Sequence, residues 1–166
     1  MKDASKLKDM RLYAIFDLYD LHTDFFRRAL EGISDEDAHK RLDTKANHLA
    51  WIAGSIVESR FEGARNLGVD VKAESHELFS NHQGLQEGTT YPPLKQYLAD
   101  WERVSPILRE KTLEATAEWL DTRFNMEGWE ASNYELITFM TYREANMIGQ
   151  IALWRRLLGY PAMNYM

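Results

Sequence analysis

The sequence has no cysteine, and this absence excludes disulfides, thiolate zinc sites, iron–sulfur clusters and thiol catalysis. Any bound metal would therefore need histidine, carboxylate or water ligands. Long apolar runs are also missing. The longest stretch without Asp, Glu, Lys or Arg, residues 46–57, is much shorter than the roughly 20 residues that cross a bilayer. The amino terminus lacks the apolar segment of a signal peptide, so we expect a cytoplasmic protein that does not enter membranes.

Basic residues are too few for a general affinity for phosphate backbones. The chain has 20 Lys and Arg residues against 26 Asp and Glu residues, a net charge of −6 at pH 7. We therefore expect no nucleic acid as a partner. Two short basic pairs, Arg27 with Arg28 and Arg155 with Arg156, are expected on solvated helix faces.

Apolar residues recur at steps of three and four along four long segments, the spacing of one face of an α-helix. The polar face of the second segment is expected to carry Glu58, Arg60, Glu62 and Arg65. Ser132 and Glu135 form a capping box, which is the clearest helix start in the chain. The predicted long helices cover about residues 6–30, 45–66, 92–113 and 133–158, with a short helix at 34–41.

Between the second and third long helices, residues 69–92 lose this period and are rich in Ser, Asn, Gln, Gly, Thr and Pro. This composition predicts a long connection with one short turn near residues 75–79. No segment predicts a strand. The predicted fold is all-α, a four-helix bundle with a long second connection, formed by one domain over residues 1–166.

Two short motifs lie on the second and the last of these helices. The first is NHLAWIAGSI at residues 47–56, and the second is REANMIGQI at residues 143–151. Together with the order of the helices, they resemble the DinB family, which carries N-x-x-x-W-x-x-G-H-I and H-x-x-x-H-x-G-Q-I at these places. The resemblance covers essentially the whole chain. It implies the same helical bundle and a stress-related setting, since the family name refers to induction by DNA damage rather than to DNA contact.

The three histidines that bind a divalent metal in that family are all replaced in this chain. The matching positions hold Ser55, Arg143 and Met147. A guanidinium does not coordinate metals, and a thioether is a weak ligand for zinc or nickel. We therefore expect neither the family metal nor another cofactor.

His48 offers a way to rebuild a metal site. It lies two helical turns before Ser55 on a similar face, and Glu58 or Glu144 would have to join it. The simpler interpretation makes His48 a hydrogen-bonded residue near the start of its helix. The other histidines lie in separate predicted elements, without the spacing of a metal-ligand pair: His22, His39, His76 and His82.

Three polar residues fall on the predicted core stripes, where buried polar groups need partners: Ser55, Arg143 and Gln150. One hypothesis is a ligand pocket at the former metal position, in which Arg143 binds a small anionic ligand through a carboxylate or phosphate. The candidate residues are Ser55, Arg143, Met147, His48 and Gln150. The other hypothesis pairs Arg143 with a core carboxylate, Asp17 or Asp24, and makes Met147 a packing residue.

These observations favour a DinB-like protein without metal that binds a small molecule or self-associates, most simply as a homodimer through its helix faces. Most of the five tryptophans are expected to be packing residues; the alternative for Trp119 and Trp129, which flank an irregular link, is that they line a pocket or a dimer surface. The alternative is a metal-dependent hydrolase or a thiol transferase, the chemistry that the family resemblance implies. Its site would be rebuilt around His48, Ser55, Glu58 and Arg143.

Overall fold

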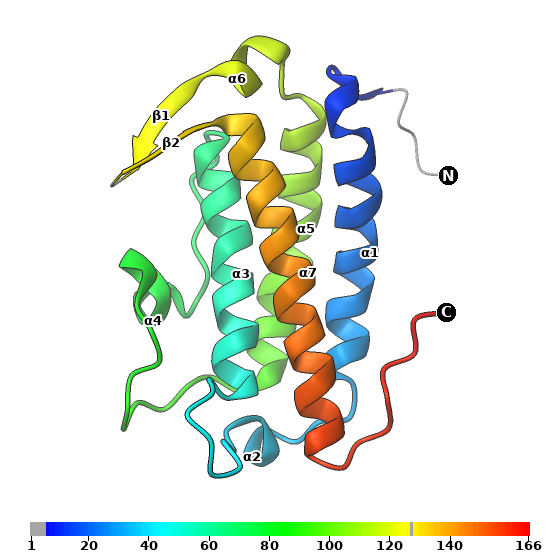
Figure 1. The fold of residues 1–166 in the computed structure, drawn as a ribbon, viewed down its shortest axis with the longest axis vertical. Coiled ribbons are helices and arrows are strands. Elements are labelled where there is room, and N and C mark those ends of the chain that lie inside the picture. The colour runs from blue at the N-terminus through cyan, green and yellow to red at the C-terminus, as the bar shows by residue number, and fades with distance from the viewer. Residues whose placement is uncertain (1–5, 127) are drawn as a thin grey trace.

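Four long helices dominate residues 6–126 and 128–166, the part of the chain that the computed structural model describes (Figure 1). Helix α1 packs against α5 and α7, and α3 packs against the same two helices. Helices α3 and α5 run in one direction, and α1 and α7 run in the other (Figure 1). Their bounds are Tyr13–Leu30 for α1, Leu49–Asn66 for α3, Leu94–Leu113 for α5 and Asn133–Leu157 for α7.

The long second connection is confirmed. Because α3 and α5 are parallel, the chain must return along the molecule before α5 begins, and Figure 1 shows this return path beside α3. It contains the one-turn helix α4 (His76–Phe79) and a 3₁₀ turn at Ser80–His82. The short helix predicted at 34–41 is α2 (Asp35–Ala38). Helix α1 begins later than predicted, after a separate 3₁₀ turn at Met10–Leu12.

The predicted capping box is present at the start of α7. The Ser132 backbone N–H donates to Glu135 Oε2 at 2.7 Å, and the Glu135 N–H donates to Ser132 Oγ at 3.2 Å. These bonds satisfy backbone groups that the first helical turn leaves without partners. At the other end Gly159, with φ of 88°, allows the chain to leave the helix.

The prediction that the chain has no strand is wrong. Strands β1 (Arg123–Met126) and β2 (Trp129–Ser132) form an antiparallel hairpin between the short helix α6 (Ala117–Asp121) and α7. The rings of Phe124 and Trp129 meet edge to face at 6.3 Å across the hairpin. Four-residue strands are too short to show a clear alternation of apolar and polar residues.

Helix α3 is the centre of the core, and it is buried on nearly every side. Glu58 and Arg60, expected on its polar face, are 6% and 1% exposed. Arg155, expected on a solvated face of α7, is also buried, and its guanidinium donates to the carbonyls of Ala29, Glu31 and Pro161. Among residues 6–126 and 128–166, no helix is both long and apolar enough to span a bilayer.

Candidate functional site

Two of the positions that the resemblance to DinB proteins matches to histidines meet between α3 and α7. Arg143 Nη2 donates to Ser55 Oγ at 2.8 Å, and Nη1 donates to Ser59 Oγ. Ser55 and Arg143 line a cavity of about 300 Å³, which we call the polar cavity. Its wall also includes Phe79 of α4 and His82 of the following turn. The sequence therefore predicted this juxtaposition correctly.

Arg143 has no carboxylate partner. Within the described residues it forms hydrogen bonds with the two serine hydroxyls and no ion pair. Burial lowers the pKa of its guanidinium, and the negative charges of Glu62 and Glu144 act in the opposite direction. Arginine stays protonated in either case, because its ordinary pKa lies far above neutral pH. The polar cavity thus contains a fixed positive charge with unused N–H donors.

Two other buried polar atoms beside this cavity have no hydrogen-bond partner among the described residues. They are Trp51 Nε1, a donor, and Glu58 Oε2, an acceptor, and both residues line the cavity. The other carboxylate oxygen of Glu58, Oε1, is paired with Arg65 at 2.7 Å and with His76 at 2.8 Å. Buried polar groups are rarely left unpaired, so these atoms mark places where a bound molecule would supply the missing partner.

The remaining pocket candidates lie elsewhere. Met147 is buried in the main apolar core, which confirms the packing interpretation. Gln150 is exposed and donates to Asn146 at 2.7 Å, so its assignment to the core was wrong. The pairing of Arg143 with Asp17 or Asp24 was also wrong, because Asp17 is exposed and Asp24 pairs with Arg27 and Arg28.

His48 is the cap of α3, as the simpler interpretation held. Its Nδ1 accepts a hydrogen bond from the Trp51 N–H at 3.1 Å. Its ring lies 5.3 Å from that of His39 and 5.1 Å from that of Tyr91, outside the polar cavity. Burial lowers the pKa of His48 to about 4, and the nearby charges of His39 and Arg41 add to this effect against the weaker pull of Glu87.

This cap makes stability depend on pH. The pKa of His48 is about 4 in the folded protein and 6.5 in the unfolded chain. The contribution of the neutral His48 cap to the free energy of unfolding is therefore complete above pH 6.5 and is lost as the pH falls toward 4. A protonated Nδ1 also stops accepting the Trp51 N–H. We expect a loss of about 1–2 kcal/mol over this range, after allowing for solvent screening. Urea unfolding measures the free energy of unfolding at pH 7 and at pH 5. Its decrease between the two should be smaller in His48→Asn than in the wild type, because asparagine caps the helix without titrating. An equal decrease in both proteins would contradict the assignment.

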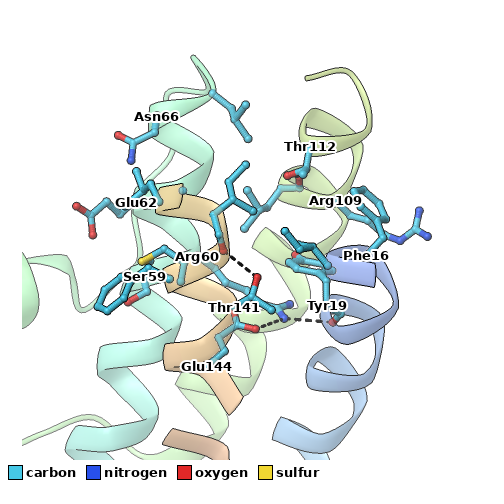
Figure 2. A pocket seen from close by; sticks show the side chains of 18 of the residues that line it. Phe16, Tyr19, Ser59, Arg60, Glu62, Asn66, Arg109, Thr112, Thr141 and Glu144 are labelled. Atoms are coloured by element: carbon cyan, nitrogen blue, oxygen red, sulfur yellow. Dashed lines mark hydrogen bonds and ion pairs between the residues drawn. The ribbon is translucent and has the colours of Figure 1, made fainter. Parts of the chain in front are cut away.

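A buried ionic network lies deeper between the helices. Arg60 of α3 donates to both carboxylate oxygens of Glu144 of α7, at 2.6 and 2.9 Å. His22 of α1 lies 3.2 Å from the same carboxylate. Burial alone would raise the pKa of Glu144, but Arg60 and His22 outweigh it and the pKa is lowered. Figure 2 shows the Arg60 side chain between Glu144 and Tyr19.

This network lies along a second cavity, of about 200 Å³, which we call the apolar cavity. Most of its wall is aliphatic or aromatic and comes from all four long helices, and Figure 2 shows part of this lining. Trp119 and Trp129 line it, so for these two residues the structure agrees with the pocket, one of the alternatives to simple packing.

The described residues do not assemble the rebuilt metal site. Glu58 is held by Arg65 and His76, and Glu144 by Arg60 and His22, so neither carboxylate joins His48. Within the described ranges, no three His, Cys, Asp or Glu side chains are grouped to hold a metal ion.

No protein-family model matches the chain, and no curated protein matches it at a significant level. The resemblance to DinB proteins therefore depends on the two motifs and on the order of the helices.

Sequence reasoning missed Arg60 as a buried residue and the pairing of Glu144 with Arg60 and His22. A signal was present, because Arg60 is four residues after Ile56 and four before Ala64, both fully buried. Glu144 has the same spacing from Met140 and Ile148. Both charged residues therefore lie on core stripes, and a charge on such a stripe predicts a buried partner on a facing helix.

Proposed function

We propose that the protein binds a small molecule with an anionic group in the polar cavity, and that Arg143 is the anchor. The observation that carries this proposal is the Arg143 guanidinium, which lines the cavity and bonds only to serine hydroxyls. A partly buried guanidinium without a carboxylate has a strong affinity for carboxylates and phosphates, because its planar fork matches their oxygens. A bound anion would complete its set of partners.

We further propose that the chain is a DinB-like four-helix bundle whose metal position has become this binding site. The order of the helices, the parallel pairing of α3 with α5 and the apposition of Ser55 and Arg143 support this proposal. We do not extend it to a hydrolase or a thiol transferase, because His48 caps α3 outside the cavity. Pairing of two copies through the helix faces stays a prediction of the sequence.

Thermal unfolding with a panel of small carboxylates and phosphates tests the anchor. At least one anion should raise the melting temperature of the wild type by several degrees, since a ligand of the folded state stabilises it. Arg143→Met should abolish this shift. Arg156→Met is the matched control, because it removes the same charge from an exposed position of α7 and should keep the full shift. A shift that persists in Arg143→Met, or no shift with any anion in the wild type, would contradict the proposal.

A further inference from the structure

We infer that the ligand is an amphipathic monocarboxylate, with its carboxylate on Arg143 in the polar cavity and its apolar chain in the apolar cavity. This inference rests on the proposed function and adds the chemical class of the ligand. Three observations support it: the two cavities share lining residues, the apolar cavity has a mostly apolar lining, and the charges around the polar cavity favour a single negative charge.

The two cavities share one wall. Ser59 and Glu62 of α3, Phe139 and Met140 of α7, and His82 line both of them. Ser59 also bonds to the Arg143 guanidinium, so the charged anchor lies at this common boundary. The chain of a molecule held at Arg143 would have to pass the side chains of Ser59 and Met140 to enter the apolar cavity.

The apolar cavity suits an uncharged chain. Its wall includes Phe16 of α1, Leu108 of α5 and Ile137 of α7. Its volume of about 200 Å³ exceeds the roughly 150 Å³ of an apolar cavity that holds benzene, so it has room for an apolar chain of several carbons.

The two guanidinium groups that line the apolar cavity are already paired with carboxylates of the protein. Arg60 is paired with Glu144, and Arg109 is paired with Asp20 at 2.8 Å. Neither guanidinium is therefore free to attract the ligand's charge, which leaves Arg143 as the place for the head group.

The polar cavity suits one negative charge rather than two. Arg143 supplies the positive charge, and Trp51 Nε1 is an additional unpartnered donor. Glu62 lies near enough to raise the pKa of Arg143, and its negative charge opposes a doubly charged phosphate more than a carboxylate. Arg65 offsets the charge of Glu58 through Oε1, and the head group of the ligand faces Arg143 and Trp51 rather than the unpartnered Oε2 of Glu58.

Calorimetric titration with butyrate, octanoate and decanoate tests the inference. Decanoate should bind at least tenfold more tightly than butyrate, because only the longer chain reaches the apolar cavity. Arg143→Gln should weaken decanoate binding at least tenfold, whereas Arg156→Gln should not change it. Glu62→Gln should tighten binding severalfold, because it removes the opposing charge. The melting temperature of each variant shows whether it is folded.

A brominated chain reports where the tail lies. With 10-bromodecanoate, the bromine should quench tryptophan emission from Trp119 and Trp129, which line the apolar cavity. Trp129→Phe should reduce this quenching, and Trp154→Phe, which alters a core residue outside both cavities, should not.

The outcomes separate the inference from the proposed function. Arg143-dependent binding without any effect of chain length, or without quenching by the bromine, would overturn the amphipathic ligand and leave the anion site in place. Binding of small anions with no binding of decanoate would do the same. Decanoate binding that is unchanged in Arg143→Gln would overturn both.

Discussion

Replacing Glu144 with alanine should lower the free energy of unfolding by about 3–5 kcal/mol, because it leaves the Arg60 guanidinium buried without its counter-charge. Arg60 is 1% exposed, and its two bonds to Glu144 are 2.6 and 2.9 Å long. This is the largest stability effect that we expect from a single substitution in the described part of the chain.

Arg60 is unable to leave this position easily. Its Nη1 donates to Thr23 at 2.8 Å and to Ser105 at 2.7 Å, and its guanidinium lies 3.5 Å from the centre of the Trp101 ring. These contacts hold the side chain of Arg60 in place but do not neutralise its charge. In Glu144→Ala the folded protein therefore contains a buried, unpaired charge, which lowers its stability. A substitution that also removes the arginine should therefore be less harmful than the loss of Glu144 alone.

Urea unfolding of a double-mutant cycle measures the coupling between the two residues. Glu144→Met and Arg60→Met should each be strongly destabilising, and the double variant should be more stable than the sum of the single losses predicts. Glu110→Ala is the control at an exposed position of α5, and it should change the free energy of unfolding by less than about 0.5 kcal/mol. A loss below about 1 kcal/mol in Glu144→Ala would contradict the role of the pair.

Local signals in the sequence account for most of the helical structure. The period of three and four residues shows which face of a helix is buried, and it predicted both helices and the residues at which α3 and α5 end. Gln150 shows where the period becomes ambiguous. Gln150 and Ile151 are adjacent on α7, and only the packing of neighbouring helices decides that Ile151 is the buried one.

The candidate site was predicted only in part, because its partners are far apart in the chain. The motifs brought Ser55 and Arg143 together, 88 residues apart, through their resemblance to the metal positions of a family. The pairing of Arg60 with Glu144 over 84 residues had no such guide. A helical pattern predicts that a charge lies on a buried stripe, but the partner depends on how two helices are placed against each other.

Gly54 is the second position where one substitution should have a large effect. It lies within α3, and a Cβ atom built there would be 2.3 Å from Phe79 Cζ and 2.8 Å from Tyr97 Cε1. Such contacts force buried rings to move, which typically costs about 1–3 kcal/mol and sometimes more. Alanine favours the helix by about 1 kcal/mol over glycine, so for contacts this short we expect Gly54→Ala to lower the free energy of unfolding by about 1–2 kcal/mol.

Gly63→Ala on the same helix is the matched control. Its Cβ would lie 3.4 Å from the nearest atom, Leu108 Cδ1, so the helix preference of alanine should leave stability unchanged or raise it by about 0.5–1 kcal/mol. Equal effects of the two substitutions in urea unfolding would contradict the role of close packing at Gly54.

A substitution at Gly54 should also affect the polar cavity through Phe79 of α4. Phe79 lines that cavity as well as touching Gly54, so a displaced ring changes the cavity wall. The double variant Gly54→Ala with Phe79→Leu replaces the ring by a smaller side chain and so removes the clash. It should recover part of the stability that Gly54→Ala loses. Recovery in the double variant, measured against Phe79→Leu alone, would identify Phe79 as the group that requires glycine at this position; strict additivity would assign the loss to Tyr97 instead.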